Sequence, residues 1–307
     1  MTTLPNFFVI GAAKSGTTSL YTYLREHPQV FMSPVKEPNF FSWGMSGETP
    51  PPGFRGTVIR DLGSYRDLFK DVTDETAIGE ASPSYMRELE TADRIRRRVP
   101  EAKLIAILRD PIERAYSGFL MFRRNGREPI SRFDEAIEAE QRRQLTDRGY
   151  LERSRYVPQL RPYIEHFPSE QLQVHLYDDL RADAPGVVRE ICSFLGVDTD
   201  FRPDTSRRHN PAGSFRSLPM QRFMDDLPGP ILSTAERIAP RRVRQRVYWT
   251  LRAWNTRPQP QLSVGTRERL LPLVRDDVLE LQDLIDRDLS SWLVSDASSP
   301  RQPEAGR

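Results

Sequence analysis

A short apolar run followed at once by a loop with two glycines is the feature that most constrains how this chain folds. Residues 7–10 (FFVI) have the apolar character of a buried strand. The loop GAAKSGTT covers residues 11–18, and apolar side chains then recur at helical spacing up to Glu26. The sequence therefore predicts a strand, a loop and a helix. Such a unit binds anions, because the N–H groups at a helix N-terminus point outward.

The loop offers both a tight backbone and side-chain donors. Gly11 and Gly16 allow the turn, and the donors around them are Lys14, Ser15, Thr17, Thr18 and Ser19. In the Walker A loop, a lysine directly follows the second glycine. Here Lys14 precedes Gly16 by two residues, so an ordinary ATP or GTP loop is disfavoured. The sequence predicts a phosphate-binding loop of another kind.

A second strand-to-helix junction carries another pair of potential anion ligands. Residues 103–108 (KLIAIL) form the clearest buried strand, since the run is short and apolar and ends at Arg109. The helix predicted from Ile112 to Arg123 places Ser117 about two turns beyond that strand. Both side chains are expected above the carboxyl edge of a parallel sheet. Two anion sites suit a ligand with phosphate at two positions.

Strands and helices alternate along the rest of the chain. Further strands are predicted at residues 30–32, 77–79 and 172–177, and helices at residues 62–69, 133–148, 187–195 and 266–294. We therefore predict an α/β, P-loop-like fold of three layers, with a central parallel sheet flanked by helices and a helical C-terminal extension. A single domain over residues 1–294 and a disordered tail over 295–307 are expected.

Two further segments have a distinctive composition. Trp43 to Phe54 contains glycines and a run of three prolines, which predicts a surface loop, and this loop is expected to border an acceptor cleft. Arg241 to Arg252 is basic with interleaved apolar residues, which predicts an amphipathic helix with a solvated basic face. Contact of this helix with an anionic membrane or an acidic glycan is the alternative.

The composition excludes several classes of function. The 307 residues include 45 Lys and Arg against 43 Asp and Glu, and a net charge of +2 predicts no nucleic-acid partner. The single Cys192 excludes an intramolecular disulfide, and four scattered histidines give no metal-ligand spacing. No apolar run approaches the roughly 20 residues of a transmembrane segment. We expect a cytoplasmic protein, and the oligomeric state stays open.

The two anion motifs together resemble those of the sulfotransferases that use 3′-phosphoadenosine 5′-phosphosulfate (PAPS), especially the branch of the heparan sulfate enzymes and many bacterial relatives. Residues 11–20 (GAAKSGTTSL) are similar to the loop that binds the 5′-phosphosulfate. Arg109 and Ser117 match the element that binds the 3′-phosphate. The segment KEPNFF (residues 36–41) is similar to the one that carries the catalytic glutamate, here Glu37.

Two other segments match this family less closely. EASPSY (residues 80–85) resembles a motif whose second position is usually lysine, where this chain has Ala81. The contact with the acceptor or the transition state that a lysine would give is therefore missing. Residues 208–217 are similar to a basic loop that closes over the nucleotide, which would bring Arg216 to PAPS.

The resemblance implies transfer of a sulfuryl group from PAPS to a hydroxyl, less readily an amine, of a carbohydrate or a hydroxylated small molecule, leaving adenosine 3′,5′-bisphosphate. Lys14 would stabilise the leaving group and Glu37 would act as general base, with no metal required. Two alternatives use the same loop: a small-molecule kinase that uses ATP and magnesium, and a non-catalytic protein that binds anions or glycans. Without the resemblance, Lys36 and Glu37 are typical of a solvated ion pair.

Overall fold

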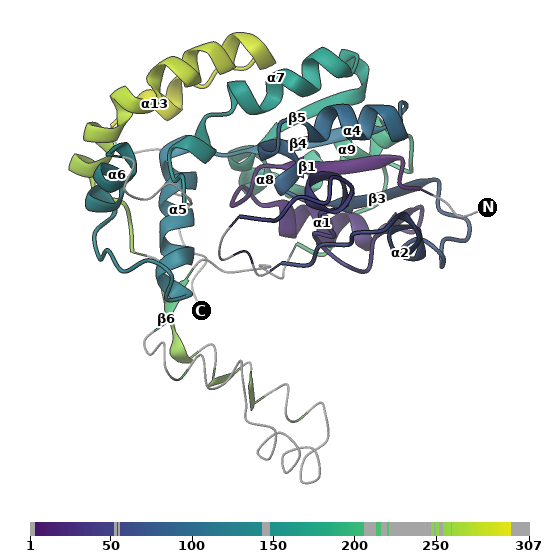
Figure 1. Cartoon of the computed structure of the whole chain (residues 1–307), viewed down its shortest axis with the longest axis horizontal. Coiled ribbons are helices and arrows are strands. Elements are labelled where there is room, and N and C mark those ends of the chain that lie inside the picture. The colour runs from purple at the N-terminus through teal and green to yellow at the C-terminus, as the bar shows by residue number, and fades with distance from the viewer. Residues whose placement is uncertain are drawn as a thin grey trace.

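The fold is built on a five-stranded parallel sheet with the strand order β2-β3-β1-β4-β5 (Figure 1). The computed structural model describes residues 4–51, 54, 56–142, 148–205, 213–215, 220, 243, 247, 248, 250, 251, 254–258 and 260–295. The strands are β1 (Phe7–Gly11), β2 (Val30–Met32), β3 (Ala77–Ala81), β4 (Lys103–Leu108) and β5 (Leu172–Leu176). A separate antiparallel pair joins β6 (Gly213–Phe215) to β7 (Thr256–Pro258).

Helices cover both faces of the sheet. The α-helices are α1 (Thr17–Arg25), α2 (Leu62–Asp67), α3 (Ser84–Arg87), α4 (Thr91–Arg98), α5 (Pro111–Arg124), α6 (Phe133–Gln141), α7 (Val157–His166), α8 (Tyr177–Ala182), α9 (Ala184–Leu195) and α13 (Val264–Ile285). Short turns of other helix types are η1 (Phe40–Gly44), η2 (Glu152–Ser154), η3 (Ser169–Gln171) and η4 (Ser290–Leu293). The long C-terminal helix α13 lies beside α7 over one face (Figure 1).

The period of two along the central strands separates two apolar cores. In β1, Phe8 and Ile10 point into the core that contains α7 and α13, whereas Phe7 and Val9 point into the core that contains α1 and α9. Successive residues of β4 alternate in the same way. Because both faces are covered, the middle strands are apolar throughout, as expected for a buried parallel sheet. The structure confirms the predicted three-layer α/β fold.

The predicted C-terminal ends of two helices were wrong. The helix expected over residues 266–294 ends at Ile285, because Asp286 adopts a left-handed conformation (φ 50°) that terminates it. The helix expected over 133–148 ends at Gln141, and residues 143–147 lie outside the described part of the chain. Most of the basic segment 241–252, and the predicted tail beyond Ser295, also lie outside it.

The start of α5 links the sheet to the C-terminal helix. Asp110 caps this helix by accepting hydrogen bonds from the backbone N–H groups of Ile112 and Glu113 at 2.9 and 3.0 Å. Its other carboxylate oxygen accepts a hydrogen bond from Arg267 of α13 at 2.5 Å. The residue that follows Arg109 is thus fixed by both local and distant contacts. Within the described residues, no helix combines the length and apolar character needed to cross a membrane.

Candidate functional site

A cavity of about 470 Å³ opens at the carboxyl ends of β1, β3 and β4. In a parallel sheet, this edge is where loops from neighbouring strands meet, and it is the usual position of ligand sites. The cavity is lined by the loop after β1, the segment around Glu37, the start of α3 and much of α5. The two predicted anion-binding elements therefore face one common space.

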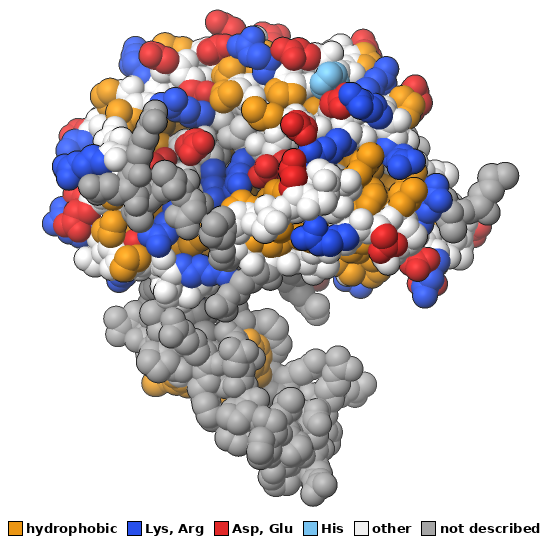
Figure 2. All heavy atoms as spheres, in the orientation of Figure 1, with side chains coloured by type: hydrophobic (Ala, Val, Ile, Leu, Met, Phe, Trp, Pro, Cys, Tyr) orange, Lys and Arg blue, Asp and Glu red, His pale blue; other side chains and the backbone are white. Residues whose placement is uncertain are grey.

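Basic side chains dominate the wall of this cavity. They are Lys14, Arg87, Arg109, Arg114, Arg124, Arg148 and Arg153. Among the described residues that line it, Glu37 alone is acidic. Elsewhere, basic and acidic side chains are interspersed over the face shown in Figure 2, in line with the net charge of +2. The attraction for an anion is therefore local to the cavity.

The N-terminus of α1 points its bare backbone at this space. Gly16 occupies the N-cap position with φ 96°, and no side chain among the described residues caps the helix. A Cβ at Gly16 would lie 3.0 Å from Tyr177, so both conformation and space require glycine there. Thr17, Thr18 and Ser19 line the cavity with the helix end. Uncapped N–H groups at a helix start are suited to hold phosphate.

Ser15 behaves differently from the other predicted loop donors. Its side chain is fully buried, and its backbone N–H donates to the carbonyl of Ala12 at 3.2 Å. The turn that exposes Thr17 and Thr18 therefore points Ser15 inward. Arg216, the remaining predicted nucleotide ligand, lies outside the described residues.

Lys14 is the cation at the centre of the loop. Its backbone lies in the left-handed region (φ 75°), and its side chain lines the cavity. Burial lowers the pKa of Lys14 to about 8. Repulsion acts in the same direction, from the guanidinium groups of Arg124, Arg114 and Arg109. Such crowding of positive charge is unfavourable in the free protein and is relieved when an anion binds.

Arg109 connects the second element to the first. Its guanidinium donates to the carbonyl oxygen of Lys14 at 3.5 Å and pairs with Glu113 at 3.1 Å. It also lies over the ring of Tyr177, 4.9 Å from the centroid. Ser117, two turns into α5, lines the same cavity. The predicted pair is therefore next to the glycine loop.

Arg114 is a structural cation, although no role was assigned to it from the sequence. The side chain is buried, and it donates to the carbonyls of Ala13 and Tyr150 and to Ser154 at 3.0–3.1 Å. These bonds tie the glycine loop to α5 and to η2. No local sequence signal separates Arg114 from its neighbours, because its acceptors lie far away along the chain.

Glu37 faces the cavity from an unusual backbone conformation. Its φ is 62°, which is rare for a residue with a long side chain, and its carboxylate pairs with Lys36. Its side chain is 42% exposed, so a molecule in the cavity can reach it. Its backbone N–H donates to the carbonyl of Ala81 at 3.0 Å, which attaches this segment to the end of β3.

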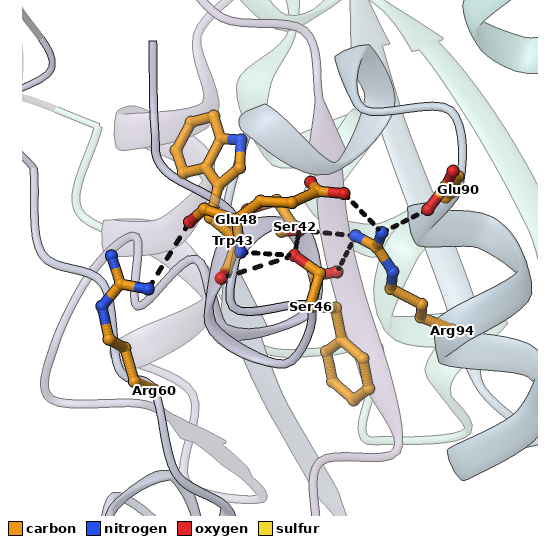
Figure 3. A network of polar contacts seen from close by, with 8 residues as sticks. Ser42, Trp43, Ser46, Glu48, Arg60, Glu90 and Arg94 are labelled. Carbon is orange, nitrogen blue, oxygen red and sulfur yellow. Dashed lines mark hydrogen bonds and ion pairs between the residues drawn. The ribbon is translucent and has the colours of Figure 1, made fainter. Parts of the chain in front are cut away.

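The start of the loop predicted from Trp43 to Phe54 is packed into the protein. The loop expected from Trp43 begins inside η1, and Trp43 is buried against Phe54, with ring centroids 4.7 Å apart. Arg94 of α4 donates to the carbonyls of Phe41 and Ser42 at 3.3 and 2.5 Å (Figure 3). The first two residues of the predicted surface loop, Trp43 and Gly44, therefore belong to η1 and are buried.

The other end of this turn is attached to the same arginine. Figure 3 shows the Arg94 guanidinium between the carboxylates of Glu48 and Glu90, which arrive from opposite sides. Ser46 donates back to the carbonyl of Ser42 at 3.2 Å. Trp43 and Phe54 both line the cavity, so Arg94 indirectly fixes the wall that they form. Residues 52, 53 and 55 lie outside the described part.

Metal ligands do not gather at this site. Across the residues that the structure describes, no group of three or more His, Cys, Asp or Glu side chains is placed to hold a metal ion.

Comparison with known proteins extends these observations. The sequence model of the sulfotransferase domain family matches residues 4–226. Human bifunctional heparan sulfate N-deacetylase/N-sulfotransferase 3 is 32% identical over 208 residues, which is 63% of this chain and 22% of that protein. Mouse heparan sulfate glucosamine 3-O-sulfotransferase 3A1 is 29% identical over 196 residues, which is 63% of this chain and 46% of that protein.

A solved structure covers nearly the whole chain. The crystal structure of a sulfotransferase from Alicyclobacillus acidocaldarius is 33% identical, has a TM-score of 0.70, and covers 94% of this chain and 99% of its own. The present chain spans less than half the length of the two curated relatives named above. The match to the domain model over most of the chain, together with this structural similarity, shows that the protein belongs to the sulfotransferase family.

Proposed function

We propose that this protein transfers a sulfuryl group from PAPS to a hydroxyl group, less readily an amine, of a carbohydrate or a hydroxylated small molecule. The observation that carries the proposal is the single cavity that joins the α1 N-terminus and Lys14 to Arg109 and Ser117. A donor with phosphate on both sides of its ribose matches two adjacent anion sites. The carbohydrate class is proposed from the similarity to the heparan sulfate sulfotransferases.

The residues of the cavity fit such a donor. The uncapped start of α1 and the side chains of Thr17 and Thr18 would hold the 5′-phosphate, and Arg109 with Ser117 would hold the 3′-phosphate. The donor supplies an activated sulfur whose bond to the 5′-phosphate oxygen breaks as the acceptor oxygen bonds to it. Lys14 would stabilise the negative charge on that phosphate oxygen, since its ammonium lies in the same loop.

Glu37 would take the proton of the acceptor hydroxyl. Its carboxylate is the acidic group of the described cavity wall, and it is exposed enough to meet an acceptor. General-base catalysis needs a carboxylate within hydrogen-bond reach of the attacking group. Trp43 and Phe54 form the neighbouring wall and would shield the reacting groups from bulk water.

Two measurements test this function against its rivals. Thermal unfolding is followed with adenosine 3′,5′-bisphosphate in EDTA, with adenosine 5′-monophosphate in EDTA, and with ATP and magnesium. The bisphosphate is expected to stabilise the protein most, by about 2.7 kcal/mol at 100 times its Kd. A larger shift with ATP and magnesium would instead support the kinase.

The second measurement separates an enzyme from a binding protein. PAPS labelled on sulfur is incubated with a panel of desulfated oligosaccharides, unsubstituted amino sugars and hydroxylated small molecules. We expect label in at least one hydroxyl acceptor. Stabilisation by the bisphosphate without transfer to any member of a broad panel would identify a non-catalytic binding protein.

A further inference from the structure

A fully buried carboxylate lies behind the Glu37 segment, near the end of β3. Glu80 accepts hydrogen bonds from the hydroxyls of Tyr65, Tyr85 and Ser82, each at 2.6 Å. The rings of Tyr65 and Tyr85 pack with Phe41 in the apolar core. The mechanism above does not use this group. Burying a carboxylate costs free energy, and an apolar side chain of similar volume would fill the same space, so its presence needs another explanation.

The direction of these hydrogen bonds is fixed by chemistry. An ionised carboxylate accepts hydrogen bonds only, so each hydroxyl must direct its one proton to Glu80. Burial raises the pKa of Glu80 to about 7, and the hydroxyl bonds oppose that shift. Burial likewise holds the pKa values of Tyr65 and Tyr85 well above 10, so both stay protonated donors. At pH 8 the carboxylate is mostly ionised.

The oxygens of these hydroxyls therefore remain available as acceptors. Ser82 Oγ accepts a hydrogen bond from the backbone N–H of Asn39, and Tyr85 Oη accepts one from that of Phe41, both at 3.2 Å. The backbone N–H of Glu37 donates to Ala81 at the end of β3. The backbone N–H groups of residues 37, 39 and 41 are thus all bound by residues 81–85, at the end of β3 and the start of α3.

The segment needs this attachment because its backbone is strained. Glu37 and Asn39 both have positive φ, at 62° and 53°, a conformation that costs about 1–3 kcal/mol unless the surroundings impose it. The Asn39 side chain helps by donating to the carbonyls of Glu37 and Thr57 at 2.6 and 2.9 Å. Ser84 donates to its amide oxygen. Releasing the N–H of Asn39 would free the segment to relax.

We propose that Glu80 is a positioning residue, which orients the hydroxyls of Ser82 and Tyr85 as acceptors and thereby fixes the backbone that presents Glu37 to the acceptor. This inference rests on the proposed function for its catalytic consequence. The attachment itself, from Glu80 through two hydroxyls to two amides, does not depend on the reaction. Each part can therefore be tested separately.

The first test needs no turnover. Amide hydrogen exchange of residues 36–42 is compared in the full-length wild type, Glu80→Gln and Tyr65→Phe at pH 8. Glutamine adds an N–H₂ donor where an acceptor is required, so exchange at Asn39 and Phe41 should accelerate about tenfold or more. Tyr65→Phe removes one hydrogen bond from the same carboxylate but keeps the ring that packs against Phe40 and Phe41, so it should leave those amides unchanged.

The second test measures turnover with the acceptor that takes up most label in the panel above. Glu80→Gln should lower kcat about tenfold or more, because small displacements of a reacting group are expensive, while the Kd for adenosine 3′,5′-bisphosphate stays within twofold. Tyr65→Phe should keep kcat within twofold. In a Glu37→Gln background, Glu80→Gln should have little further effect, since both changes remove the same contribution.

The outcomes separate the two proposals. Unchanged amide exchange in Glu80→Gln, or an equal loss of kcat with and without Glu37, would overturn the positioning role. A wild type that transfers no label would overturn the proposed function, while the exchange experiment still decides the attachment. If Glu80→Gln does not fold, Ser82→Ala replaces it, with the same expected change at Asn39.

Discussion

The glycine loop and the Glu37 segment face the same cavity, yet they are held in different ways. Lys14 and Glu37 both have positive φ and opposite charges. The loop around Lys14 is shaped by glycine, by the start of α1 and by arginines that contact its carbonyls. The segment around Glu37 is instead held by side-chain hydroxyls that converge on a buried carboxylate. The loop around Lys14 is thus held largely through its own backbone, and the segment around Glu37 through the side chains of Ser82 and Tyr85.

This difference has a functional meaning under the proposed reaction. Every member of the family would meet the same donor, so a backbone-built anion site can serve without change. The acceptor group differs among the relatives, which include both an N-sulfotransferase and an O-sulfotransferase. Substitutions at the residues that bind the Glu37 segment can change its position. The turn at Gly16 packs closely against Tyr177 and cannot be moved in this way.

The largest expected effect is on the donor side. Lys14→Ala should lower kcat about 10³-fold, since it removes the cation that faces the leaving oxygen. Single-turnover assays with labelled PAPS measure the effect, and Lys70→Ala, at an exposed site, is the matched control. A loss below tenfold would mean that the arginines, and not Lys14, stabilise the leaving group. Lys14 would then not be the main group on the donor side.

Glu37→Gln tests the acceptor side. It should lower kcat roughly 10²-fold while the Kd for adenosine 3′,5′-bisphosphate is unchanged, because the carboxylate acts on the acceptor proton. Turnover and calorimetric titration of the same preparation check both values, with Glu101→Gln as a surface control. A tenfold weaker bisphosphate affinity would show that the two sides are not separate.

The smallest expected effect is a pH dependence of donor binding. Lys14 has a pKa of about 8 in the free protein, and a bound anion favours its charged form, so binding above pH 8 takes up a proton. The affinity for adenosine 3′,5′-bisphosphate should therefore fall about fivefold from pH 8 to pH 9. Titrations at both pH values in wild type and Lys14→Met check this, and an equal decline in the variant would exclude Lys14 as its cause.

The lowered pKa of Lys14 affects the stability of the free native protein in the opposite direction. The unfolded chain holds the Lys14 proton up to its ordinary pKa of 10.5, whereas the free native protein loses it near pH 8. Between these values the unfolded state binds more protons, so this group adds stability as the pH rises. Donor affinity and native stability should therefore respond to alkaline pH in opposite directions through one side chain.

The sequence predicts local features well and distant ones poorly. The strand, glycine loop and helix at residues 7–26 are adjacent in the chain, and their pattern identified the loop and the class of fold. The side chain of Ser15 is fully buried, and a pattern of hydroxyl residues does not reveal which of them the turn buries. Helix α4 was missed because arginines interrupt its short apolar face, and α7 because it contains Pro162.

The hydrogen bonds that hold the Glu37 segment could not be predicted from local sequence patterns. Tyr65 and Glu80 are fifteen residues apart on different elements, and neither has a local signature of a shared hydrogen bond. A glutamate in an apolar strand predicts only that a partner exists. Which hydroxyls provide it depends on how α2 and α3 pack against β3, and this packing is decided by the whole core.

The ion pair between Asp110 and Arg267 connects the C-terminal part of the chain to the residue that follows Arg109 in the cavity wall. Arg267 also donates to the carbonyls of Trp292 and Val294, so the last described residues, the start of α5 and the backbone next to Arg109 form one mechanical unit. A C-terminal truncation before Trp292 would remove two of the three acceptors that hold Arg267 against Asp110.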